Sequence, residues 1–385
     1  MSADLWNDAS ERMLARIRET SRAVGERFPH WANADSGEWV TTPDGDWTGG
    51  FFPGMLWLAH RRTGDERYRE LARPFVERLR SRLGGGPSGF RSFLFYYAGA
   101  LGASLAGDEE ARRLALDGAR DMLRLYDPKL RVVPIGSQAE EGSHLGPAEI
   151  SIDMLQAAPF FLWAARETDD PKLREAGQNH ARRVIELHLR DDSSFIQSSS
   201  LDPNTGELVR HYTHKGYSDT TTWGRAQAWG TLFSVMSYLI GPGEQTWLEA
   251  SMRGADWWIE HVPPDRVAYW DFDDPAVPNT ERDTAATAIA SAALLKLGVA
   301  APSEAQRVRY RRAGEATVEA LVRGYLTPTS ADDRRSSGRL VESCFNKRTD
   351  ARPQDAVTNA EFIVGSYYLF ECLQVLSGKV EPTEV

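Results

Sequence analysis

Cysteine is scarce in this chain, which carries only Cys344 and Cys372 among 385 residues. Two cysteines cannot form a disulfide framework or a cysteine-based zinc site, and such low usage is typical of a reducing compartment. A nucleophilic thiol at Cys344 is an open alternative to an idle one.

The chain has no apolar run of bilayer-spanning length, and its charged first twenty residues lack the apolar centre of a signal peptide. We therefore expect a soluble, cytoplasmic protein that does not act at a membrane.

Dense blocks of Lys and Arg are also absent, and the formal net charge is -10. This balance excludes a general nucleic-acid binder.

The glycines at 84–86 lack the Lys-Ser/Thr of a phosphate-binding loop, and neither HExxH nor GxSxG occurs. We therefore expect no metal and no cofactor, and a small or neutral partner. The chain would act as a monomer or a homo-oligomer.

Apolar residues recur at helical spacing in twelve segments. These segments are roughly 8–27, 51–63, 66–83, 92–106, 109–125, 148–168, 171–190, 222–240, 244–260, 282–297, 304–323 and 358–376. Twelve helices in sequence suggest six hairpins. The pattern predicts an all-α fold, an (α/α)6 barrel or six-hairpin toroid, formed by a single domain over residues 1–385.

The connections between these segments are of two kinds. Short ones share a helix-ending residue followed by a capping aspartate, as in Thr63-Gly64-Asp65, Ala106-Gly107-Asp108 and Thr168-Asp169-Asp170. Long ones, such as 28–50 and 324–357, are rich in Trp, Gly, Pro and Asp. Long loops on one face of a scaffold usually carry function. A small β-hairpin is expected there, with strands near 195–197 and 208–210 around the turn 202–206.

The segment from Tyr217 to Trp229 reads YSDTTTWGRAQAW and joins indoles, a guanidinium and an amide where a helix begins. Asp219 is a candidate N-cap for that helix. Trp223 and Trp229 could simply be core residues, because aromatic side chains bury large areas wherever they can. Arg225 and Gln227 between them are hard to bury without polar partners, and this favours a sugar-binding site.

Asp153 is the best candidate for a general acid, because apolar neighbours disfavour the ionised form of its carboxyl group. It could instead be a structural residue that caps a helix or pairs with an arginine. Glu149 lies four residues earlier and would share a helical face with Asp153, where its charge could raise the pKa of Asp153 and make it a second candidate for a catalytic role. It could instead be a solvated residue of the first helical turn. Asp283 is a candidate site residue or only an N-cap.

Together these motifs resemble glycoside hydrolase family 88, the unsaturated glucuronyl hydrolases, and more distantly family 105. The resemblance runs from about Trp47 to the last helix. It is carried by WTGGFFPGMLW at 47–57, by the Ile152-Asp153 helix, by GYSDTTTWGRAQAW at 216–229 and by YWDFD at 269–273.

The resemblance implies an (α/α)6 barrel and an enzyme that protonates C4 of a C4=C5 enol-ether uronyl sugar and adds water at C5. The hemiketal then opens and releases the second sugar. Asp153 matches the aspartate that does this work. Trp47, Trp223, Arg225 and Trp229 would line the sugar site, with Arg225 a candidate for the substrate carboxylate.

Four positions depart from the family pattern. Phe90 stands where a second aspartate is expected, Gln197 where a histidine is, Lys215 where a glutamine is, and Ala157 where an asparagine is. Lys215 and Arg91 add positive charge. One hypothesis is therefore a more anionic or differently decorated sugar, and another is catalysis by Asp153 with Glu149. The expected substrate-binding residues are Trp47, Phe90, Arg91, Gln197, His214, Lys215, Trp223, Arg225 and Trp229.

The leading interpretation is a family-88-like hydrolase of small carbohydrates. One alternative is a repurposed enzyme that acts on another sugar-containing metabolite by hydration, elimination or isomerisation. A second is a catalytically silent sugar-binding protein. A sugar epimerase would need paired histidine bases, for which His144 and His214 are candidates.

Overall fold

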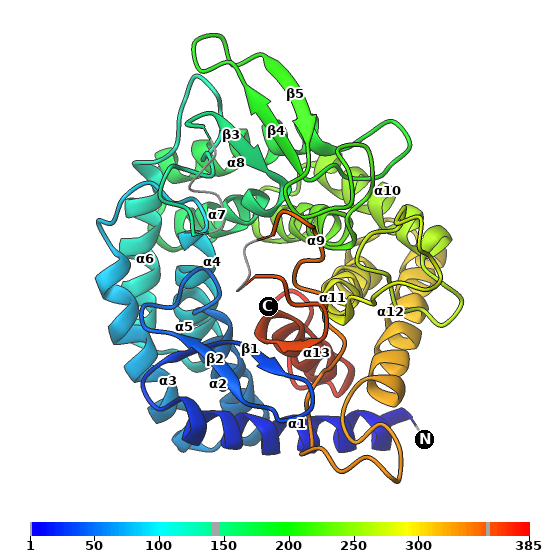
Figure 1. Cartoon of the computed structure of the whole chain (residues 1–385). Coiled ribbons are helices and arrows are strands. Elements are labelled where there is room, and N and C mark those ends of the chain that lie inside the picture. Colours follow the sequence, from blue (N-terminus) through cyan, green and yellow to red (C-terminus); the bar gives the residue numbers. More distant parts are fainter. Residues whose placement is uncertain (1, 141–145, 352–354) are drawn as a thin grey trace.

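Helices of two kinds alternate along the chain, and they explain the architecture seen in the computed structural model (Figure 1). The structure describes residues 2–140, 146–351 and 355–385. One set is buried over nearly its whole surface. It consists of α2 (Phe51–Thr63), α4 (Arg91–Phe95) with its continuation α5 (Leu101–Ala106), α7 (Ala157–Thr168), α9 (Gly224–Ile240), α11 (Thr284–Ala300) and α13 (Ile363–Leu376).

The second set buries only one face of each helix. It consists of α1 (Ser2–Val24), α3 (Glu66–Leu79), α6 (Glu109–Leu123), α8 (Pro171–His188), α10 (Gln245–His261) and α12 (Glu304–Gly324). A helix that is apolar all round belongs inside, whereas an amphipathic helix covers a core and faces water. The first set therefore forms an inner ring and the second an outer ring around it.

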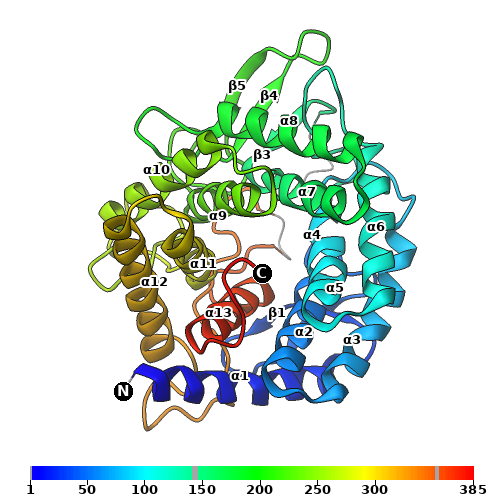
Figure 2. The ribbon, with the colours of Figure 1, turned by 180° about the vertical axis from the view of Figure 1, so that it is seen from behind.

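Each outer helix packs on the inner helix next to it in sequence, as α3 does on α2, α8 on α7 and α12 on α11. The inner ring closes because α13 packs on both α2 and α11. Figure 2 shows the same ring from behind, with α1 lying between α3 and α12. The expected (α/α)6 barrel is confirmed. None of the helices in the described part of the chain has the length and apolarity that a bilayer span requires.

Close contact between inner helices depends on small residues at their starts. Gly50 precedes α2, and a Cβ atom there would lie 2.5 Å from the carbonyl oxygen of Phe93. This is closer than packed atoms approach, so only glycine lets α2 and α4 meet in this way. The WTGG motif therefore has a packing role as well as its place at the start of an inner helix.

Two small antiparallel sheets lie on the face turned to the viewer in Figure 1. One has the strand order β3-β4-β5, with β3 (Glu149–Ser151), β4 (Ser198–Leu201) and β5 (Leu208–Tyr212). The other has the order β2-β1-β6, with β1 (Phe28–Asn33), β2 (Trp39–Thr42) and β6 (Ala360–Phe362). The predicted hairpin is confirmed as β4-β5, with its first strand a few residues later than expected.

Three expected helices begin or run differently from the sequence prediction. The segment 148–168 starts as strand β3 and a 3₁₀ turn, η3 (Ile152–Gln156), before α7 begins. The segment 92–106 contains a π-helical turn, η2 (Tyr96–Ala100), and the segment 358–376 starts as strand β6. Pairing with strands distant in sequence overrides helical periodicity at two of these starts.

Candidate active site

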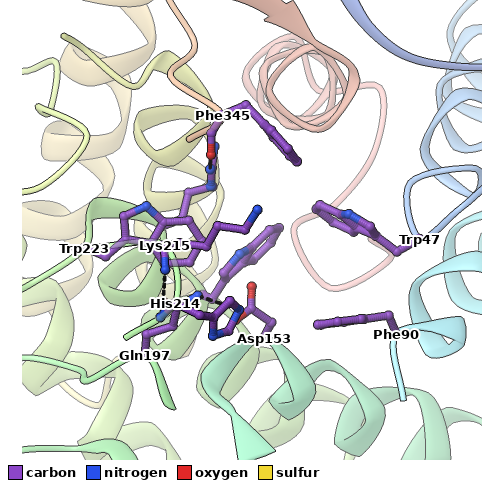
Figure 3. A pocket seen from close by; sticks show the side chains of 10 residues that line it. Trp47, Phe90, Asp153, Gln197, His214, Lys215, Trp223 and Phe345 are labelled. Carbon is purple, nitrogen blue, oxygen red and sulfur yellow. Dashed lines mark hydrogen bonds between the residues drawn. The ribbon is translucent and has the colours of Figure 1, made fainter. Parts of the chain in front are cut away.

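A cavity of about 340 Å³, counting the space open to solvent at its mouth, lies at the end of the barrel that carries the long loops. Among the described residues, ten side chains line it, and Figure 3 shows them: Trp47, Phe90, Asp153, Gln197, His214, Lys215, Trp223, Arg225, Trp229 and Phe345. Nine of these were expected from the sequence. Phe345 was missed, and its place in the long connection 324–357 is the only sequence signal that could have indicated it.

Several of these residues stand just before or at the start of an inner helix. Trp47 precedes α2, Phe90 precedes α4, Asp153 precedes α7, and Trp223 is the N-cap of α9. The N-terminal ends of these inner helices therefore converge on the cavity. Helix N-termini carry partial positive charge, so this end of the barrel favours an anionic ligand group.

Asp153 sits in the 3₁₀ turn η3, not in a regular helix. The turn is held from two sides, because the Ile152 N–H donates to the Gln197 carbonyl at 2.8 Å and His180 Nε2 donates to the Met154 carbonyl at 2.6 Å. Ile152 and Met154 are fully buried, whereas 9% of Asp153 is exposed. The turn thus presents its one carboxyl group to the cavity.

One side of the cavity is aromatic. The rings of Phe90 and Trp47 lie 6.2 Å apart, and Trp47 packs edge-on against Phe93. Trp229 stacks on Phe233 at 4.9 Å and is fully buried. Trp223 and Trp229 therefore belong both to the core and to the cavity wall, so the two roles weighed from the sequence coexist.

The opposite side is polar and is organised by Gln197. Its Oε1 accepts hydrogen bonds from the backbone N–H groups of His214 at 3.1 Å and Lys215 at 2.9 Å, and from the Thr213 hydroxyl. With Oε1 committed to donors, the amide Nε2 faces His214 Nε2 at 3.2 Å and donates to it. His214 therefore carries its proton on Nδ1, which contacts Ser198 Oγ at 2.9 Å.

Arg225 ties the cavity to two distant segments. Its guanidinium pairs with Asp283 at 3.1 Å and donates to the carbonyls of Cys344, at 3.1 Å, and Phe345. It also lies 4.7 Å from the centre of the Trp223 ring. Asp283 caps α11 through the N–H groups of Ala285 and Ala286, so its structural role is confirmed. Burial raises the pKa of Asp283, and Arg225 opposes that shift.

Comparison with known proteins identifies the family of this chain. The unsaturated glucuronyl hydrolase of Bacillus sp. (strain GL1) is 33% identical over 378 residues, which cover 96% of each chain. The chain belongs to the unsaturated glucuronyl hydrolase family. The crystal structure of the enzyme from Bacillus sp. GL1 superposes with a TM-score of 0.87 at 31% identity, again over 96% of each chain.

A second relative of the family is the unsaturated chondroitin disaccharide hydrolase of Streptococcus pyogenes serotype M1. It is 27% identical, over 84% of this chain and 81% of its own. A structure of a variant unsaturated glucuronyl hydrolase with dGlcA-Glc-Rha-Glc has a TM-score of 0.87 at 31% identity and covers 96% of both chains. The scan against family models found no match.

Glu149 does not line the cavity, and the expectation that it shares a helical face with Asp153 was wrong. It lies in strand β3, where a separation of four residues does not bring side chains onto a helical face. Glu149 Oε1 accepts from the Ser200 hydroxyl at 2.8 Å across the β3-β4 pair. Burial, and after it the nearby Glu149 carboxylate, raises the pKa of Tyr212. Glu149 therefore contributes to the β3-β4 pair and does not contribute to the cavity wall.

Arg91 also does not line the cavity. Its guanidinium is buried, pairs with Asp121 at 2.7 Å and donates to the carbonyl of Arg82 at 2.7 Å. Burial lowers the pKa of Arg91. This side chain links the start of α4 to α6, so of the two added cations only Lys215 reaches the site.

Two remaining expectations have clear outcomes, and a third is not tested. Asp219 does not cap α9, because Trp223 is the N-cap and Asp219 instead accepts from the Thr213 N–H at 3.0 Å. Cys344 is buried and burial raises the pKa of its thiol, which makes it a poor nucleophile. His144 lies outside the described residues.

Proposed function

We propose that this chain hydrolyses unsaturated uronyl saccharides, with Asp153 as general acid and base. The observation that carries the proposal is that Asp153 supplies the only carboxyl group among the described residues that line the cavity. The named activities of the relatives support an unsaturated uronyl sugar as substrate. They favour this function over a repurposed enzyme or a silent binding protein.

The reaction needs one group that gives and then takes a proton. The protonated Asp153 carboxyl group transfers its proton to C4 of the C4=C5 double bond, and positive charge develops at C5 and the ring oxygen. Water adds to C5 and loses a proton to the Asp153 carboxylate, which restores the acid. The bond between C5 and the ring oxygen then breaks, leaving a ketone at C5 and a hemiacetal at C1 that expels the second sugar.

The aromatic walls contribute by excluding water other than the reacting molecule. On the polar wall, His214 Nε2 faces the Gln197 amide at 3.2 Å and its Nδ1 contacts Ser198 Oγ at 2.9 Å. Neighbouring side chains therefore contact both ring nitrogens and fix the orientation of the ring at the cavity. Asp153 remains the only group here assigned to proton transfer.

The test is turnover of plain and sulfated unsaturated uronyl disaccharides, followed by loss of their ultraviolet absorbance. Asp153→Asn should lower kcat at least about 10³-fold. The variant loses both the general acid and the general base, and each kind of catalysis contributes about 10²–10⁴-fold. Asp117→Asn, on the outer helix α6, is the matched control and should leave kcat unchanged. Full activity in Asp153→Asn would refute the assignment, and an equal loss in Glu149→Gln would restore the two-carboxylate mechanism.

A further inference from the structure

A second cavity, the rear cavity, lies at the end of the barrel opposite the active site, which is the end seen in Figure 2. It measures about 530 Å³, counting the space open to solvent at its mouth. Its wall includes Tyr96 and Leu101 from the helix that joins α4 to α5, Trp163 and Arg166 from α7, and Ile240, the last residue of α9. Helices, and not the short turns between them, form most of this wall.

Buried side chains bring polar atoms without a protein partner to the rear cavity. Tyr96 and Trp163 are each 3% exposed. In the described part of the chain, neither the Tyr96 hydroxyl nor the Trp163 indole N–H makes a hydrogen bond. The indole nitrogens of Trp247 and Trp258 also lack partners and are fully enclosed, whereas the polar atoms of Tyr96 and Trp163 keep access to open space. Because both side chains are otherwise buried, that space is the cavity they line.

The backbone at Tyr96 is also irregular. Residues Tyr96–Ala100 form the π-helical turn η2 in an inner helix that is α-helical on either side. Such turns are rare and occur frequently at functional sites. Tyr96 and Ala100 stand at the two ends of this turn and Leu101 follows it, and all three line the rear cavity. The turn therefore shapes the cavity, and this observation is independent of the unpartnered polar atoms.

Arg166 adds positive charge beside these donors. It is exposed on α7, and no carboxylate among the described residues pairs with it. The carboxylate of Glu384, which also lines the cavity, pairs with Arg61 at 3.0 Å. Burial, and after it the Glu371 carboxylate, raises the pKa of Tyr96, whereas Arg166 is close enough to lower it. The C-terminal ends of α7 and α9 carry partial negative charge, so an anion bound here depends on Arg166.

We propose that the rear cavity binds a small organic carboxylate, of about the size of a sugar acid. Indole N–H and guanidinium groups only donate hydrogen bonds, so the ligand must supply acceptors, and charged acceptors form the stronger bonds. The volume lies in the range of small-molecule sites. An inorganic anion would leave the apolar wall at Leu101 and Ile240 uncovered, and a neutral sugar would make no use of the charge on Arg166. The site does not rest on the proposed reaction at Asp153.

The Trp163 indole N–H provides a direct readout, because its NMR signal shifts when an acceptor binds to it. The whole chain is isotopically labelled at its indole nitrogens, and Trp163→Phe identifies the signal. Sodium glucuronate, glucose and sodium sulfate are then added separately at constant ionic strength. The Trp163 signal should shift saturably with glucuronate and should shift much less with glucose or sulfate. The signals of Trp223 and Trp229 report separately on any binding at the active site.

Three results would overturn this proposal. A Trp163 signal that glucuronate leaves unchanged, or shifts without saturation, would show that no carboxylate site exists. An equal shift with glucose or with sulfate would show that the carboxylate is not what is recognised. Asp153→Asn should abolish turnover and leave the saturable shift of Trp163 in place, so failure of the proposed reaction and failure of the rear site are seen separately.

Variants of the lining residues complete the test. Arg166→Met, at an exposed position, should weaken glucuronate binding about tenfold, the effect of a lost charge-assisted hydrogen bond, and Arg166→Lys should retain part of the affinity. Tyr96→Phe removes only the hydroxyl and should weaken binding about threefold. Arg323→Met removes an exposed guanidinium on α12 and is the matched control, which should bind like the parent. Equal affinity in Arg166→Met and in this control would overturn the site.

Discussion

The two ends of the barrel are built by different kinds of contact. At the end with short turns, Gly64 and Gly107 adopt φ of 69° and 59°, and Asp65 and Asp108 cap the next helices through N–H groups two or three residues away. At the end with long loops, Arg225 holds carbonyls that lie 119 and 120 residues further along the chain. One end is shaped by neighbours in sequence and the other by tertiary partners.

This difference explains why the functional site lies where it does. A short capped turn has few conformations and little surface to offer a ligand. A long loop held by a buried ion pair can carry side chains such as Phe345 to a cavity far from their place in sequence. The long-loop end should therefore be the more sensitive to loss of a single charged side chain.

The largest effect is expected for Arg225→Met. The change leaves Asp283 buried without its cation, and removing one partner of a buried pair costs about 3–5 kcal/mol. Because burial already raises the pKa of Asp283, the loss should be larger at pH 8 than at pH 5, where the carboxyl group can take up a proton. The measurement is the free energy of unfolding in urea at both pH values.

Two further variants sharpen this result. Arg225→Met combined with Asp283→Asn should recover at least half of the loss, because the amide can still cap α11 without carrying a charge. Arg323→Met removes an exposed ion pair with Glu319 on α12 and should cost less than about 1 kcal/mol. If Arg225→Met lowered the free energy of unfolding by no more than Arg323→Met does, the distinction between local and tertiary contacts would be wrong.

A second effect concerns His180, which supports the turn that carries Asp153. Its Nδ1 accepts from the Val133 N–H at 3.1 Å, and burial lowers its pKa to about 4. His188, in the same helix, is also lowered to about 4. The unfolded chain binds protons near pH 6.5 and the folded chain does not. Stability is therefore complete above pH 6.5 and lost as pH falls towards 4, by about 2 kcal/mol for each histidine at pH 5.

The measurement is urea unfolding at pH 7.5 and pH 5. In His180→Gln about half of the pH-dependent loss should disappear, because one of the two protonation sites of the unfolded state is removed. Stability that is flat across this range in the parent chain would contradict the neutral, buried state of both imidazoles.

The smallest effect is expected at the short-turn end. Asp108→Ala removes the cap of α6 and the partner of Arg69 and Arg73, and should cost about 1–2 kcal/mol with no change in kcat. Asp108→Asn keeps the cap and should recover most of this loss. A fall in kcat would show that the short-turn end communicates with the active site.

Local rules in the sequence predicted much of the framework. The bounds of α2 were predicted without error, and the three capped turns appear where Gly or Asp ends one helix and Asp begins the next. The motifs, together with the resemblance to family 88, also pointed to nine of the ten described residues that line the cavity. Errors came where a strand partner distant in sequence competes with helical periodicity, as at Glu149 in β3, which pairs with Ser200.

The sequence by itself therefore determined the barrel, because alternation of fully apolar and amphipathic helices leaves few ways to bury the apolar surface. Only the tertiary structure decided which charged side chains serve the fold and which serve the site. Arg91 and Lys215 are both buried cations, yet Asp121 pairs with the Arg91 guanidinium between two helices, whereas Gln197 accepts from the backbone N–H of Lys215 at the cavity. The physical reason is that packing decides which groups each side chain and its backbone meet.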